Sequence, residues 1–408
     1  MALVSELELP GFDYTDPMLR GERFHEAMRE VRARGWLASG PYGAIVLDRE
    51  ACEWWLRTRE AIFPGMTIAQ MFGVEGGPLY EQMKRNILHV NGPDHTRLRS
   101  LLNPALSARA VERYRPALVG FLEGLFAEAC SGARDGVVGC DFVEAFAKPY
   151  PSQTIARVMG APIADAPRLH HWSKVIQRQF DAAAMATEMD AIEEAVREFY
   201  EYAAALVGAR RGEPADDLIS MLIAAEEEGE RLDDVECINL VFNILVGGVD
   251  TTQSQLAHAI RLLAEHPDQW RLLAGSPDLA EAAVEEALRF EPITPFTARI
   301  ATSDISYRDV TFPAGTIVMV CAYAGNRDAA GERPDEFDIT ADRGRARALT
   351  FGAGIHYCVG ANLARLELKE ALRFLAPRLQ DLRLDGEPEY ETIMGIYGLS
   401  KLPIAFSI

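Results

Sequence analysis

Long stretches of the chain place apolar residues at helical spacing, and short turns rich in glycine and proline separate these stretches. Strand-like alternation is confined to two short places, residues 43–47 and residues 300–320. In the second place, residues 309–315 supply turn residues between the alternating β formers. The pattern predicts a mainly α protein with small β-sheets (α+β).

The longest predicted helix runs from Asp233 to Glu265. Asp233 and Glu236 form a plausible capping box at its start, and His266-Pro267 closes its end. Residues 238–249 are apolar on nearly every side, which predicts burial at the centre of the protein. Residues 247–252, Gly-Gly-Val-Asp-Thr-Thr, interrupt this apolar stretch. Two glycines and three hydrogen-bonding residues are unfavourable in the interior of a buried helix. A local rule broken in this way usually marks a functional site.

Length and composition favour one large domain over residues 1–408, because nothing in the chain resembles a linker. Hydrophobic residues make up 49% of the sequence, and no uncharged apolar run is long enough to cross a membrane. The first ten residues lack the features of a signal peptide, and the six cysteines form no CxxC pair. We therefore expect a cytoplasmic protein with reduced thiols.

The net charge of −20 comes from 41 basic and 61 acidic residues. Such a chain repels nucleic acid and anionic lipid, so we expect neither as a partner. Basic residues nevertheless gather on both sides of residues 351–360: Arg343, Arg345, Arg347, Arg365 and Lys369. This cluster is either an electrostatic docking surface for an acidic protein or an ordinary solvated surface, and both interpretations stay open.

One cysteine lies in a segment punctuated by glycines, Phe-Gly-Ala-Gly-Ile-His-Tyr-Cys-Val-Gly at residues 351–360, directly before a strongly helical stretch. The glycines permit close backbone approaches, so Cys358 can be presented to a flat cofactor lying over the loop. Backbone N–H groups and the positive end of the following helix would favour its thiolate form. A metal can be held there through sulfur, whereas the other five cysteines are more simply small buried hydrophobes.

The segment resembles the cysteine loop of the cytochrome P450 family, because Phe351, Gly354, Cys358 and Gly360 match the spacing of the family motif. The resemblance implies a helical bundle around a buried haem b, with a long central helix on the distal side. It also implies that Cys358 is the axial ligand of the haem iron. The family matches run from about His95 to Gly360 in the expected order.

The polar run of the central helix resembles the oxygen-activation motif of the same family. By this resemblance, Gly247 thins the helix so that dioxygen fits, Thr251 hydrogen-bonds dioxygen or an ordered water, and Asp250 relays protons. The structural alternative is that Thr251 only caps a kink in the helix.

Two further sets of residues match family positions. Glu286 and Arg289, three residues apart on a helix, match a structural Glu-x-x-Arg pair that would brace the cysteine loop. Glu336 occupies the place where many relatives supply an additional arginine, which leaves open how Arg289 is completed. Four side chains match the partners of the haem propionates, although each alone is equally consistent with a surface charge: His95, Arg99, Arg299 and His356.

The resemblance implies a haem-thiolate monooxygenase that uses dioxygen to hydroxylate, or oxidatively dealkylate, a hydrophobic small molecule. No reductase signature follows Gly360, so the electrons are expected from NAD(P)H through a separate ferredoxin or flavodoxin docked at the basic cluster. The alternatives are a peroxide-driven peroxygenase and a non-catalytic haem-binding or partner-binding relative. By this resemblance five residues are expected to line the substrate pocket, although core packing better explains any one of them taken alone: Val246, Ile293, Thr294, Phe296 and Ile393.

Overall fold

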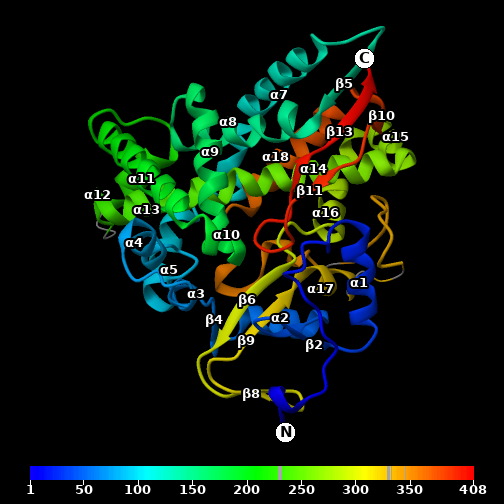
Figure 1. Ribbon diagram of the computed structural model, residues 1–408. Helices are drawn as coiled ribbons and strands as arrows, with labels where there is room; N and C mark the ends of the chain where they lie inside the picture. Colours follow the sequence, from blue (N-terminus) through cyan, green and yellow to red (C-terminus); the bar gives the residue numbers. More distant parts are fainter. Residues whose placement is uncertain (228–231, 329–330, 332, 345) are drawn as a thin grey trace.

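The structure is a computed structural model that describes residues 1–227, 232–328, 331, 333–344 and 346–408. Helices form the larger part of the molecule, and the largest sheet lies toward the end that carries the N-terminus (Figure 1). The helices are α1 Glu22–Arg32, α2 Arg49–Arg57, α3 Met66–Met71, α4 Gly77–Arg85, α5 Gly92–Leu102, α6 Ala108–Val111, α7 Arg115–Cys130, α8 Pro149–Met159, α9 Ala166–Gln177, α10 Ala182–Thr187, α11 Met189–Gly212, α12 Leu218–Glu227, α13 Asp234–Gly248, α14 Asp250–Glu265, α15 Pro267–Gly275, α16 Ala280–Phe290, α17 Ala322–Asp328 and α18 Ala361–Leu375.

The strands are short and form small sheets, as expected for this fold class. Their bounds are β1 Ala2–Leu3, β2 Leu37–Gly40, β3 Gly43–Val46, β4 Ala61–Ile62, β5 Val137–Asp141, β6 Phe296–Ala301, β7 Ile305–Tyr307, β8 Val310–Phe312, β9 Ile317–Cys321, β10 Gln380–Leu384, β11 Glu389–Tyr390, β12 Leu399–Lys401 and β13 Pro403–Ser407. The largest sheet has the order β2-β3-β9-β6-β4, and β3 pairs with β9 in parallel although more than 250 residues separate them. The other sheets are β1-β8-β7, β10-β13-β5 and β11-β12.

The strand predictions are confirmed at residues 43–47 and need correction at residues 300–320. Strand β3 occupies the first place, but the second holds parts of four strands. Strand β8 falls within the segment expected to be a turn, because a tight turn at Arg308, with φ of 52°, pairs β7 with β8. The sequence pattern also missed the strands near the C-terminus, since their partners lie far away in the chain.

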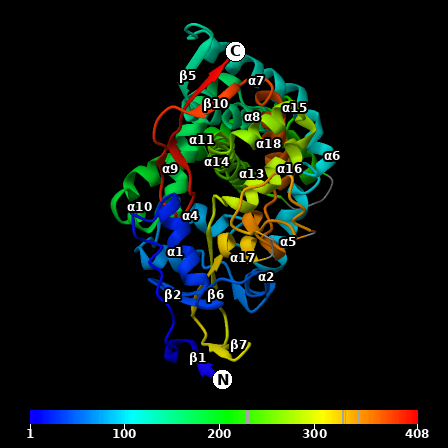
Figure 2. The ribbon, with the colours of Figure 1, turned by 90° about the vertical axis from the view of Figure 1, so that its right-hand side faces the viewer.

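The central helix begins as predicted, with a capping box in which the Asp233 carboxylate accepts from the Glu236 N–H at 2.7 Å. It is not one helix, however, because α13 ends at Gly248 and α14 begins at Asp250. The break between them lies near the middle of the molecule in both ribbon views (Figures 1 and 2). By length and composition the stretch Asp234–Glu265 could cross a membrane, but 67% of its most apolar window is buried inside the protein. Its apolar character therefore reflects its place in the core.

The buried side chains form one large cluster among the helices and two smaller clusters at the sheets. The large cluster includes apolar residues of α8, α11, α13, α14, α16 and α18, so the helix that carries the break is held from several sides. Close packing of this kind fixes α13, α14 and α18 relative to one another.

Candidate functional site

Backbone conformation presents Cys358 at the start of α18. Gly352 and Gly354 both have φ of +70°, which side chains other than glycine rarely adopt. A Cβ atom at Gly354 would also lie 2.5 Å from the carbonyl oxygen of Leu56. The loop closes through a hydrogen bond in which the Cys358 N–H donates to the Phe351 carbonyl oxygen at 2.9 Å. Both glycines are therefore required by geometry.

Opposing effects act on the pKa of the Cys358 thiol. Burial raises its pKa, whereas hydrogen bonds from the Gly360 and Ala361 N–H groups and the charges of Arg99 and Arg365 lower it. The expected N–H donors are present, but burial outweighs them and the pKa of the thiol stays raised. A bound metal ion is therefore what would remove the proton, as is usual for a cysteine ligand.

Near Cys358 lie two arginines and two histidines that have no carboxylate partners in the part of the chain described. Burial, followed by the charges of His95, Arg299 and Arg99, lowers the pKa of His356 to about 3. The rings of His95 and His356 lie 4.5 Å apart, and the buried Nε2 of His95 has no hydrogen-bond partner. All four residues expected to hold the propionates are thus brought together.

Among the described residues, neither of the two arginines of this group has an anionic partner. Arg299 is almost fully buried, its guanidinium donates to the carbonyl oxygen of Ala298 at 2.8 Å, and burial lowers its pKa to about 10. Arg99 donates to the carbonyl oxygen of Tyr357 and to Asn103 Oδ1, which are neutral acceptors. Buried guanidinium groups ordinarily need an anionic partner. Two carboxylates on a flat cofactor beside Cys358 fit this set, so the residues present fit haem.

The break in the central helix frees two backbone carbonyl groups, and side chains satisfy both. The Thr251 hydroxyl donates to the carbonyl oxygen of Gly247 at 2.6 Å, and the Gln177 amide donates to that of Val246. Val249, between the two helices, has φ of −90° and ψ of −71°. The capping of a kink by Thr251, first considered as an alternative to a catalytic role, is therefore present in the structure.

The two glycines before the break differ in their surroundings. A Cβ atom at Gly248 would lie 2.3 Å from Ile155 Cδ1, so this residue allows α8 to pack closely on α13. A Cβ atom at Gly247 would meet no heavy atom within 4 Å, apart from those of its own helix and chain neighbours. Gly247 therefore faces open space one turn before Thr251, as its expected role requires.

Asp250 is a buried carboxylic acid at the first position of α14. Its Oδ1 atom has no hydrogen-bond partner. Burial and the charge of Glu391 raise its pKa to about 7, although the charge of Lys174 acts in the opposite direction. Lys174 and Glu391 pair with each other at 2.7 Å. Asp250 can consequently both take up and release a proton near neutral pH.

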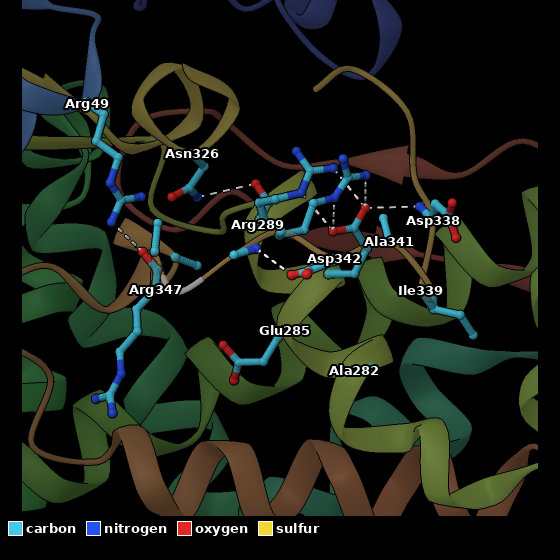
Figure 3. A pocket seen from close by; sticks show the side chains of 15 residues that line it. Arg49, Ala282, Glu285, Arg289, Asn326, Asp338, Ile339, Ala341, Asp342 and Arg347 are labelled. Carbon is cyan, nitrogen blue, oxygen red and sulfur yellow. Dashed lines mark hydrogen bonds and ion pairs between the residues drawn. The ribbon is translucent and has the colours of Figure 1, made fainter. Parts of the chain in front are cut away.

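The Glu286 and Arg289 pair forms as predicted, in the buried interior. Arg289 Nε and Nη2 donate to the two carboxylate oxygens of Glu286 at 2.7 and 2.8 Å. Arg343 completes the pair, which the sequence had left open: its guanidinium donates to Glu286 Oε1 at 2.8 Å. Glu336 contributes only its carbonyl oxygen, which accepts from Arg289 at 2.9 Å. Glu286, Arg289 and Arg343 line a cavity of about 320 Å³ at the surface (Figure 3).

Burial opposes ionisation of Glu286, but hydrogen bonds from Arg289 and Arg343 hold its pKa below the usual value. The backbone N–H of Asp338 adds a further hydrogen bond to Glu286 Oε1 at 2.9 Å. The segment before the cysteine loop is thus tied to α16 through one carboxylate. The sequence placed Arg343 in the docking cluster and missed this structural role.

Comparison with known proteins settles the family. The sequence model of the family described as "Cytochrome P450" matches residues 153–273 and 278–389. The chain belongs to the cytochrome P450 family. Among its P450 relatives, the luteothin monooxygenase of Streptomyces thioluteus is 34% identical and aligns over 98% of this chain and 96% of its own. The mycinamicin IV hydroxylase/epoxidase of Micromonospora griseorubida is 36% identical and aligns over 76% of each chain.

Among solved P450 structures, that of CalO2 superposes with a TM-score of 0.89 and 31% identity, covering 98% of this chain and 99% of the other. The mainly α P450 fold predicted from the sequence is thereby confirmed. The family also confirms a haem-thiolate monooxygenase, which uses haem and dioxygen and has both a substrate and a redox partner. The two alternatives, a peroxygenase and a non-catalytic relative, are not favoured.

The basic cluster of this P450 is partly neutralised in the structure. Arg365 pairs with Glu285 at 2.5 Å and lies over the ring of Phe351, and Lys369 pairs with Glu281 at 2.7 Å. Arg343 is occupied at Glu286, whereas Arg347 is exposed. Arg345 lies outside the described residues. The basic residues of the cluster therefore differ in how far their charges are paired and exposed.

The residues expected to line the substrate pocket have diverse surroundings. Phe296 packs against Phe12, Tyr14 and Phe24 with ring centroids 5.3–6.3 Å apart, and Ile393 belongs to the same buried cluster. Val246 and Ile293 are buried as well, and Thr294 is partly exposed. Core packing thus accounts for Phe296, at the start of β6, and for Ile393, and their place in a substrate pocket stays a prediction.

Proposed function

We propose that this cytochrome P450 is a single domain over residues 1–408 that hydroxylates, or oxidatively dealkylates, a hydrophobic small molecule in the cytoplasm. Electrons would pass from NAD(P)H through a separate ferredoxin or flavodoxin. The named relatives act on luteothin and mycinamicin IV, which supports a small organic substrate. The six cysteines are all free, which agrees with a reducing compartment.

In this proposal Cys358 would hold the haem iron through its sulfur, and Arg99, Arg299, His95 and His356 would bind the propionates. Bound haem supplies reductive activation of dioxygen, which protein side chains cannot perform. Gly360 and Phe351 shape the cysteine loop. Arg365 stacks on the Phe351 ring, and its Cζ atom lies 4.5 Å from the ring centroid. Glu286 and Arg289 connect α16 to the segment before the cysteine loop and so hold the loop in place. The protein thereby fixes the position of the cofactor and excludes water from it.

The observation that carries the proposal is the helix break at Val249 beside open space at Gly247. It places the Thr251 hydroxyl and the Asp250 carboxyl one residue apart, the first partly exposed and the second buried. Cleavage of dioxygen consumes protons, while the site must otherwise stay dry. Asp250 would carry protons from the Lys174 and Glu391 side, and Thr251 would position the final donor.

The Thr251→Ala variant tests the second role. We expect its reduced, carbon monoxide-bound absorption band to be unchanged, while product formed per electron pair falls by about 10²-fold. The measurement is electron consumption against product in the reconstituted holoenzyme. Thr251→Ser keeps the hydroxyl and should retain coupling. Tightly coupled turnover by Thr251→Ala would show that the hydroxyl only caps the kink.

The Asp250→Asn variant tests the first role through pH. A proton donor must carry its proton, so turnover of the wild type should fall as the pH rises through about 7, where Asp250 loses its proton. The variant should be about 10²-fold slower and lack this inflection. Turnover driven by hydrogen peroxide, which needs no relay, serves as the control. Equal loss in the peroxide reaction, or an unchanged pH profile, would contradict the relay.

The electron donor is proposed to dock at the basic side of the cysteine loop, around Arg347 and the less exposed Arg343, Arg365 and Lys369, with Arg345 beside them in the sequence. Arg347 is exposed, and its carbonyl oxygen accepts from Arg49 at 2.7 Å, so two arginines stand together there (Figure 3). An acidic partner would be attracted to these charges despite the net charge of −20.

A further inference from the structure

The central helix exposes one narrow stripe. Of residues 237–251, only four are not buried, namely Asn243, Gly247, Gly248 and Thr251. Gly248 is in contact with α8, as described above. The other three are spaced by four residues, so they lie on one face of the helix, a turn apart. We call this face the α13 stripe.

Asn243 is the polar side chain of the α13 stripe that no catalytic role explains. Its Nδ2 atom donates to the carbonyl oxygen of Asn239 at 2.7 Å, one turn earlier. That bond fixes which end of the amide is the nitrogen, so Oδ1 is held on the other side. Among the residues described, no side chain or backbone group donates to Asn243 Oδ1. The acceptor is therefore oriented, accessible and free.

We propose that Asn243 Oδ1 accepts a hydrogen bond from the substrate, and that the substrate is an apolar molecule with a hydroxyl or N–H donor. The proposal rests on the function proposed above and specifies its substrate class. Along a helix, Asn243 stands about 6 Å from Gly247 and about 12 Å from Thr251. The donor should therefore lie on the order of 6–12 Å from the oxidised carbon.

The surroundings make this contact selective. No other side chain of the α13 stripe supplies a competing donor, because Gly247 has no side chain and the Thr251 hydroxyl donates to the Gly247 carbonyl oxygen. A substrate without a donor would cover the carboxamide oxygen and leave it unpaired, which is costly in a desolvated pocket. Sites built to bond a hydroxyl or N–H group reject analogues that lack it far better than apolar pockets distinguish sizes.

The test compares alcohols with their methyl ethers, which keep the oxygen and lose the donor. The panel runs from dodecanol to cholecalciferol, and dissociation constants of the holoprotein are measured by haem spin-state titration and calorimetry. We expect the best-bound alcohol to bind about tenfold more tightly than its ether to the wild type. In Asn243→Leu this ratio should fall to about one, with ether affinity little changed.

Asn239→Leu is the matched control, because it removes the same side chain one turn earlier on the same face of the helix, where the side chain is buried. It should keep the preference for the alcohol. The proposal is overturned if no panel alcohol outbinds its ether, or if Asn243→Leu retains the preference. Both failures leave oxygenation of other substrates unaffected, whereas failure of the proposed function would leave no oxygenated product from the holoprotein supplied with dioxygen and an electron donor.

Discussion

Replacement of Cys358 by alanine is expected to abolish the strongly red-shifted absorption band of the reduced, carbon monoxide-bound protein, together with all oxygenase activity. The band reports a thiolate on the haem iron, and electron donation from that sulfur is what favours cleavage of dioxygen. Cys358 receives hydrogen bonds from the Gly360 and Ala361 N–H groups at the start of α18, close to the partly buried Arg99 and Arg365. Cys321 has a similar pair of N–H donors at the start of α17, but it lies outside the glycine loop, and burial raises its pKa to about 12.

Cys140→Ala provides the control for loss of a thiol as such. Cys140 is partly buried in β5, and burial raises its pKa to about 11, as for an ordinary structural cysteine. This variant should keep the red-shifted band and full activity. If Cys358→Ala kept the band, or if Cys140→Ala lost it, the assignment of the ligand would be wrong.

Replacement of Glu286 by alanine is expected to destabilise the protein by about 3–5 kcal/mol, the range for a buried charge left without its partner. Two guanidinium groups, those of Arg289 and Arg343, would lose their carboxylate at once. A loss of this size is a large part of the total stability of a typical domain. The measurement is the urea midpoint of unfolding, together with the fraction of purified protein that retains haem.

Glu285→Ala is the matched control one residue away on α16. Glu285 also pairs with an arginine, Arg365, but both side chains are partly exposed, 39% and 24% respectively. Solvent screens such a pair, so its removal should cost no more than about 1 kcal/mol. Equal unfolding midpoints for the two variants would refute a special bracing role for Glu286.

The motifs of the site could be predicted because each depends on residues that are close in sequence. The cysteine loop owes its shape to Gly352 and Gly354, whose positive φ angles other residues rarely adopt. The start of the central helix follows equally from a local signal, the Asp233 capping box. Such patterns are readable because backbone conformation and short-range hydrogen bonds determine them.

The contacts that complete the site could not be predicted in the same way. Arg343 was read as a surface charge, since no local pattern shows that the chain returns it to Glu286, 57 residues earlier. The free oxygen of Asn243 was hidden inside an apparently uniform apolar run, although an asparagine four residues before Gly247 was a signal that could have been noticed. The packing of Phe296 against Phe12, Tyr14 and Phe24 could not be predicted either, because it depends on the N-terminal segment.

The sequence by itself determined the family, the mainly α fold, the cysteine loop and the polar interruption of the central helix. Each of these depends on the types of residues and on their spacing along the chain. Only the tertiary structure decided which charges are buried and which acceptors remain free. The pKa of Asp250 and the lack of carboxylate partners for Arg299 arise from helices and strands distant in the chain. Burial and pairing are properties of the packed interior, so they appear only when the chain is folded.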